Sequence, residues 1–131
     1  MSICGAVLLQ AQSPETKPSS AEVLRTFKTI CVQSKTPLAK PAMLAGELQK
    51  SSDFDKWGMS ITSDPADADV VVEMDHQPGW FYYTYTMTYR TSGLVLAVGQ
   101  VDVWDGKYAS AKIAKAIMKR CAAVRKTQKD K

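Results

Sequence analysis

A long alternation of apolar and polar residues over Trp80–Arg90 constrains the fold of this chain more than any other feature. Successive side chains of a β-strand point to opposite faces, so this segment gives one aromatic face and one face rich in threonine. A turn at Thr91–Gly93 and a second apolar segment over Leu94–Trp104 follow it. The pattern predicts an antiparallel β-hairpin.

Shorter patterns supply the remaining elements. Strands are predicted over Val23–Gln33, 57–62 and Asp69–Gln77, one helical turn over Asp64–Asp67, and helices over Pro41–Lys50 and Lys107–Arg125. The apolar stripe of the last helix consists of Ile113, Ile117, Cys121 and Val124. The order β-α-β-β-β-β-α predicts a two-layer α/β (α+β) fold, with a mixed, mostly antiparallel sheet of about five strands and both helices on one face.

With 131 residues, the chain has room for one domain. We expect a leader-like or flexible arm over residues 1–22, the domain over 23–126 and a basic tail over 127–131. The arm contains an apolar run, Ile3–Leu9, followed by small residues, as at the end of a secretory signal, although no Lys or Arg precedes the run. This pattern predicts a periplasmic or extracellular protein, and a disordered or edge-strand N-terminal arm is the alternative.

Several kinds of chemistry find no support in the sequence. No apolar run approaches the roughly 20 residues that a transmembrane helix needs. The acids between Asp64 and Asp75 lack the spacing and the glycine of a calcium loop, and the glycines form no phosphate-binding motif. We therefore expect no metal, no cofactor and no small-molecule substrate. A small enzyme with an unrecognised site around His76, the only histidine, is the competing class.

Two cysteines remain in the domain, Cys31 in the first predicted strand and Cys121 in the last helix. A disulfide between them would close a loop of about 90 residues and stabilise the fold by about 4 kcal/mol. Cysteines on a strand and a helix seldom meet the geometry of a disulfide. We therefore favour two buried thiols that act as small hydrophobic groups.

The net charge of +4 is unevenly distributed. Residues 107–131 contain nine Lys or Arg and one Asp, whereas residues 57–89 contain five acids and no Lys or Arg. The candidate basic surface consists of Lys112, Lys115, Lys119, Arg125 and Lys126. No aromatic base-stacking motif accompanies these charges, which argues against nucleic acid, and an acidic partner or a second copy of the chain fits them better.

The outward face of the predicted hairpin has more aromatic and aliphatic side chains than a solvated face normally carries. The candidate interaction surface consists of Trp80, Tyr82, Thr84, Thr86, Leu96, Val98 and Trp104. Binding of a protein partner or self-association would explain this surface. Burial under the N-terminal arm or under a helix is the alternative.

The segment from about Leu24 to Val124 resembles small, uncharacterised secreted α/β proteins of bacteria. The resemblance rests on Ala68–Val72, on Thr91–Leu96 and on Trp104–Gly106 ahead of an Ala/Lys helix near Ala111. More distantly, the element order is similar to the α/β domains of the curli-secretion lipoprotein, the penicillin-binding-protein activators and the TolB N-terminal domain. The resemblance implies a fold and a place in the bacterial envelope.

These observations together predict a non-enzymatic interaction protein of the bacterial envelope or the extracellular space. The alternative is a self-assembling subunit of an extracellular homopolymer, either a fibre or a ring. Such a subunit would use the aromatic strand face and the N-terminal arm.

Overall fold

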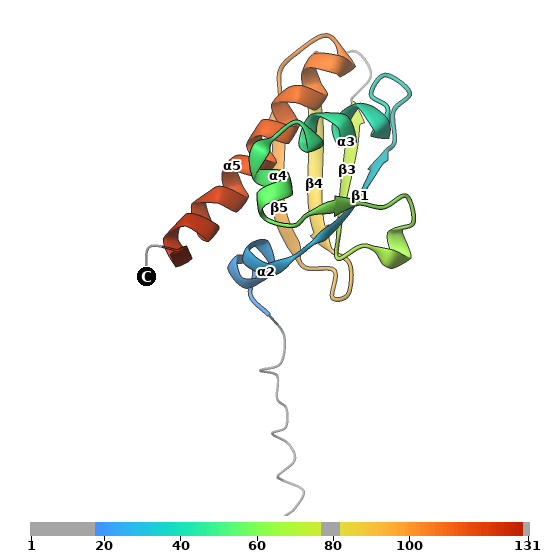
Figure 1. Ribbon diagram of the computed structural model, residues 1–131. Coiled ribbons are helices and arrows are strands. Elements are labelled where there is room, and N and C mark those ends of the chain that lie inside the picture. Colours follow the sequence, from blue (N-terminus) through green and yellow to red (C-terminus); the bar gives the residue numbers. More distant parts are fainter. Residues whose placement is uncertain (1–17, 77–81, 130–131) are drawn as a thin grey trace, which may run out of the picture.

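A computed structural model describes residues 18–76 and 82–129 of the chain. Its helices are α2 (Ser20–Thr26), α3 (Pro41–Gln49), α4 (Ser52–Lys56) and α5 (Gly106–Lys129), with one 3-10 turn, η2 (Pro65–Asp67). Its strands are β1 (Thr29–Ser34), β2 (Ser60–Ile61), β3 (Val70–His76), β4 (Tyr83–Tyr89) and β5 (Val95–Val101). Figure 1 shows their arrangement.

The five strands form one mixed sheet in the order β2-β1-β3-β4-β5. β1 pairs in parallel with both β2 and β3, so the connection from β1 through α3 to β2 returns to a parallel neighbour, as predicted. β3, β4 and β5 form the antiparallel part, and the predicted hairpin of β4 and β5 is confirmed.

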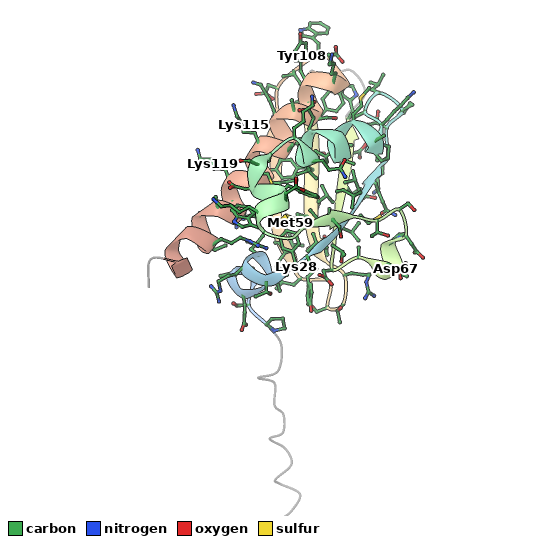
Figure 2. The ribbon with its side chains drawn as sticks, in the orientation of Figure 1. Lys28, Met59, Asp67, Tyr108, Lys115 and Lys119 are labelled. Carbon is green, nitrogen blue, oxygen red and sulfur yellow. The ribbon has the colours of Figure 1, made fainter. Side chains whose placement is uncertain are left out.

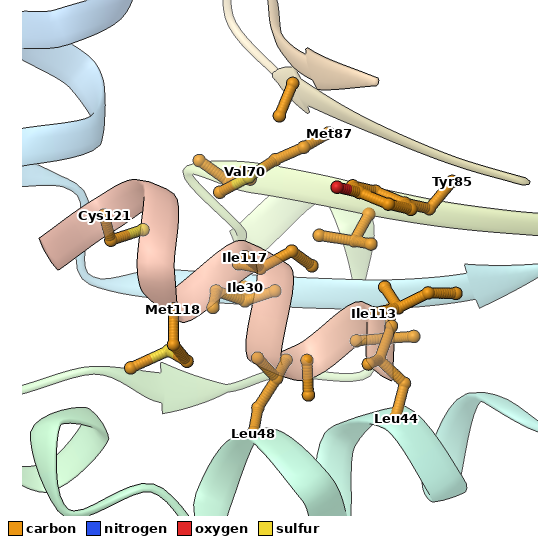
Figure 3. Packing of buried hydrophobic residues seen from close by; sticks show 14 of the residues in the cluster. Ile30, Leu44, Leu48, Val70, Tyr85, Met87, Ile113, Ile117, Met118 and Cys121 are labelled. Atoms are coloured by element: carbon orange, nitrogen blue, oxygen red, sulfur yellow. The ribbon is translucent and has the colours of Figure 1, made fainter. Parts of the chain in front are cut away.

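The helices α3 and α5 pack against each other over one face of the sheet (Figure 1). Figure 3 shows the core between the layers, with Ile113 and Ile117 of α5 and Leu44 and Leu48 of α3 gathered on the helix side of the sheet. All four side chains are fully buried. The predicted two-layer fold class, with both long helices on one face, is thereby confirmed.

The first predicted strand starts too early, because Val23 and Leu24 belong to helix α2. The backbone N–H of Glu22 donates to the hydroxyl of Ser19 (3.2 Å), and the backbone N–H of Ser19 donates to the Glu22 carboxylate (3.4 Å). This reciprocal capping box starts a helix in a segment rich in β-branched and aromatic residues. Folded structure therefore includes residues 19–22 of the predicted arm, and residues 1–17 lie outside the described residues.

The second predicted strand, 57–62, shortens to Ser60–Ile61, because α4 precedes it and ends at Trp57 as its C-cap. The predicted helical turn is confirmed as η2, which begins where the backbone N–H of Ala66 donates to the Asp64 carboxylate (2.9 Å). At the other end of the chain, α5 continues to Lys129, so residues 127–129 of the predicted tail are helical.

Two side chains of strand β5 point to the face opposite the one that the sequence predicts. The register shifts between Met87 and Thr88, which pair with Ala97 and Val95, so β5 has one extra residue there. This bulge turns both Leu96 and Ala97 into the core and leaves Val95 half exposed on the other face. The prediction that Leu96 belongs to the interaction surface is therefore wrong, and so is the prediction that Val95 faces the core.

Cys31 and Cys121 are free, buried thiols, so the alternative that we favoured is confirmed over the disulfide. Ile30 and Val32 flank Cys31 and face the helix-side core, so strand alternation places Cys31 on the opposite face of the sheet. Cys121 lies within that core. The sheet itself separates the two sulfur atoms.

The Cys121 thiol makes a pH-dependent contribution to stability. Burial raises its pKa from 9.0 to about 11, against the opposing effect of Arg125 and Arg120. The native state therefore holds this proton more tightly than the unfolded state, and the resulting stabilisation, about 3 kcal/mol at most, is lost as the pH rises from 9 toward 11. We expect the free energy of unfolding in urea to fall more steeply over this pH range for the wild type than for Cys121→Ala. Equal slopes would contradict this assignment.

Candidate functional site

Two connections leave the sheet at the same end. β1 and β3 run parallel, and β5 runs antiparallel to β4, so the carboxyl ends of β1, β3 and β5 coincide. Residues 35–40 lead from β1 to α3 there, and residues 102–105 lead from β5 to α5, both at the upper end of Figure 1. We call this region the loop end. In open α/β sheets, ligands bind preferentially at the carboxyl ends of parallel strands.

The two connections are held together at Gly106, the first residue of α5. A Cβ atom on Gly106 would lie 1.9 Å from the carbonyl oxygen of Leu38 and 3.1 Å from the Cα of Ala39. Only glycine permits this approach of two backbones. The turn that the sequence predicted at Asp105–Gly106 is therefore also the contact that fixes the loop of residues 35–40 against α5.

Hydrogen bonds that involve the hydroxyl groups of Ser34 and Thr36 stabilise the loop of residues 35–40. The Ser34 hydroxyl donates to the carbonyl of Thr36 (2.8 Å) and accepts from the backbone N–H of Thr36 (3.2 Å). The Thr36 hydroxyl, which is buried, accepts from the backbone N–H of Leu38 (3.2 Å). Such Ser/Thr turns fix the backbone locally and leave Leu38 at the tip.

The connection of residues 102–105 is held by hydrogen bonds to the start of α5 and to β4. The Asp105 carboxylate accepts from the backbone N–H of Lys107 (2.9 Å), which caps the start of α5. The Tyr83 hydroxyl donates to the carbonyl of Trp104 (3.4 Å), and burial together with the Asp105 charge raises the pKa of Tyr83. His76 packs on the Tyr83 ring, with ring centroids 4.6 Å apart, so it takes part in the packing of the loop end.

Three large side chains are exposed on this fixed base: Leu38 (54% exposed), Trp104 (76%) and Tyr108 (64%). We call these three residues the loop-end patch. Figure 2 shows Tyr108 at the upper tip of α5. The sequence analysis named Trp104 and missed the other two. Tyr108 lies in the first turn of α5, close in sequence to Trp104, whereas Leu38 joins the patch only through the long-range contact at Gly106.

The structure divides the predicted interaction surface between two places. Trp104 belongs to the loop end, and Tyr82 is half-buried just ahead of β4. Thr84, Thr86 and Val98 lie on the sheet face away from the helices, where Thr86 pairs with Val98. Trp80 lies outside the described residues. The predicted surface is therefore not one continuous patch.

The predicted basic surface also separates into two parts. Lys112, Lys115 and Lys119 are exposed along the outer side of α5, and Figure 2 shows the last two pointing away from the sheet. The first two also line a groove of about 410 Å³ between α3 and α5. Lys126 lies on α5, and its side chain is outside the described residues.

Arg125 serves the fold rather than the surface. Its guanidinium donates to the carbonyls of Leu24 and Phe27, both at 3.0 Å, and lies over the rings of Phe27 (5.3 Å) and Trp57 (4.9 Å). Burial lowers its pKa. Arg125 lies on the predicted basic helix, but its guanidinium is bonded within the fold, where it fastens α2 to the end of α5.

The acids of residues 57–89 lie away from the α5 lysines. The Asp69 carboxylate accepts from the backbone N–H groups of Lys28 and Thr29, and Asp64 caps η2, so both have structural roles. Asp67 and Asp75 are exposed, and Figure 2 shows Asp67 on the side of the molecule opposite the lysines. Asp67 and the lysines of α5 are thus separated in space as well as in the sequence.

Replacement of Gly106 tests how the loop end is held. We expect Gly106→Ala to lower the free energy of unfolding by about 1–3 kcal/mol, because its methyl group has no space beside Leu38. Gly46→Ala, in helix α3 with nothing within 4 Å of its Cβ position, should instead be neutral or stabilise by up to about 1 kcal/mol. Urea denaturation followed by circular dichroism measures both. Equal effects of the two variants would contradict the close contact at Gly106.

Within residues 18–76 and 82–129, no helix is both long and apolar enough to cross a membrane. No protein-family model matches the chain, and a search of curated proteins gives no match. Among solved structures, the chain is similar to a PelC dodecamer from Paraburkholderia phytofirmans, with 12% identity and a TM-score of 0.44 over 73% of this chain and 88% of that one. A likeness at this level establishes neither a family nor a function.

Proposed function

We propose that this chain is an exported, non-enzymatic interaction protein that binds a protein partner through the loop-end patch. One observation carries the proposal: Leu38, Trp104 and Tyr108 are all exposed on the two segments that meet at Gly106. Large aromatic and aliphatic side chains form the centres of protein interfaces. A fixed base lowers the entropy that is lost when a partner orders them.

The surroundings of the patch also suit a protein interface. Lys40, Asp105 and Lys107 are exposed beside it in the two connections. An apolar centre with a polar, charged rim is the usual composition of a protein interface. The rim charges have both signs, so they would orient a partner more than they would attract a polyanion.

Export is the second part of the proposal, and it rests on the sequence of the N-terminus. The apolar run Ile3–Leu9, followed by small residues, supports it. Fractionation of the native organism tests this part. We expect the protein in the periplasm or the medium, with a mass lower than that of the full chain. Full-length protein in the cytoplasm would contradict export.

A photo-crosslinking amino acid in place of Tyr108 tests the binding surface in cells. We expect a crosslinked partner at position 108 and none with the same amino acid in place of Asp67, on the opposite side of the molecule. With the purified partner, Trp104→Ala should weaken binding by at least about 30-fold, since central aromatic anchors contribute about 2 kcal/mol or more. Crosslinking only at position 67, or unchanged affinity of Trp104→Ala, would contradict the proposal.

Self-assembly into a homopolymer is a second candidate, and the charge separation favours it. The lysines of α5 and the exposed Asp67 lie on opposite sides, so copies stacked head to tail would bring opposite charges together. Sedimentation at several salt concentrations tests this candidate. Large assemblies that shrink as salt rises would support it, because salt screens such contacts. A species of fixed size at all salt concentrations would contradict it.

A further inference from the structure

The two edges of the sheet differ in how they are protected. One edge strand, β2, has two residues, and so short an edge offers little for another chain to pair with. The other edge strand, β5, has seven residues, with no Pro and no charged side chain. Pro, charge, shortness and a bulge are among the usual protections of an edge, and of these β5 has only the bulge, at Leu96 near its start. Among the described residues, no strand pairs with the outer side of β5.

Part of the β5 edge is already occupied. The Arg120 guanidinium reaches from α5 and donates to the carbonyl of Leu96 (3.0 Å). This contact covers the edge at the bulge, near the start of the strand. Asp102, which is exposed and accepts from the side-chain amide of Gln100 (3.0 Å), marks the other end. The available edge is therefore the five-residue segment Ala97–Val101.

Residues of this segment favour an added strand. Val98 lies on the face away from the helices and is 68% exposed. An added strand would remove part of this apolar side chain from water. Gly99 has no side chain, and the ring of Tyr85 fills the space where its Cβ would lie. Apart from Gln100, the segment Ala97–Val101 is thus apolar, and it has no charged side chain of its own, as in strands that accept another strand.

We propose that β5 pairs with β5 of a second copy of this chain, antiparallel and around a two-fold axis beside Gly99. In this register Val98 of each copy lies opposite Gln100 of the other, and Leu96 lies opposite Asp102 of the other. Arg120, bound to the Leu96 carbonyl, then faces Asp102 of the second copy, and the symmetry forms this opposite-charge contact twice.

The dimer does not depend on the proposed binding of a partner. Its sheet has ten strands, five from each copy. Because the paired strands are antiparallel, the two loop-end patches lie at opposite ends of that sheet, and neither is covered. Such a dimer would hold two partner molecules apart. If no partner binds at Tyr108, the dimer proposal still stands. If the chain does not dimerise, the proposed partner binding at Tyr108 still stands.

Sedimentation equilibrium of the full chain, with matched valine variants, tests the pairing. We expect the wild type to form a dimer of twice 14.4 kDa. Val98→Lys should raise the dissociation constant at least about tenfold, because it places two lysines near the two-fold axis. Val95→Lys introduces the same charge on the same strand and face, but outside Ala97–Val101, and should leave the dimer unchanged. Circular dichroism checks that both variants fold.

A charge exchange tests the register. Arg120→Asp should raise the dissociation constant at least about tenfold, and adding Asp102→Arg should restore the dimer by exchanging the two charges. A wild type that stays monomeric or forms open-ended assemblies would overturn the proposal. It would also be overturned by a dimer that survives Val98→Lys, or by a double variant that fails to recover.

Discussion

The contact of Gly106 with the backbone of Leu38 is the constraint on which the candidate site depends. It joins the loop after β1 to the first turn of α5, two segments far apart in the sequence. Trp104 lies just before this turn and Tyr108 within it, so one backbone contact joins the two segments that carry the three exposed side chains. The contact fixes the backbone beneath these side chains, and a fixed backbone lowers the entropy lost on binding.

Helix α5 connects this site to the rest of the fold. Its apolar stripe lies in the core, its Arg125 side chain fastens α2, and its Arg120 side chain reaches the edge of β5. Two of its basic residues thus bond to backbone carbonyls, whereas Lys112, Lys115 and Lys119 face solvent. The strongly basic composition of this segment therefore combines structural contacts with exposed charge on the outer side of α5.

The fold could be predicted from the sequence where regular patterns span many residues. The alternation in β4 and the stripe of α5 identify the hairpin, the core face and the last helix. The sequence-based predictions are wrong where one local interaction outweighs the pattern of apolar and polar residues. The capping box of Ser19 and Glu22 makes a helix of a strand-like segment, and a bulge reverses Val95 and Leu96. Leu38 could not be foreseen, because its place in the site depends on a contact between segments that the sequence does not show to be neighbours.

The central claim, that a partner binds at the loop end, is tested most directly by amide hydrogen exchange in the complex with the protein captured at position 108. The account predicts slower exchange over residues 36–39 and 104–108 in the complex than in the unbound protein, with exchange on β2 and around Asp67 unchanged. Slower exchange confined to other surfaces, such as the outer side of α5 around Lys115 and Lys119, would contradict it.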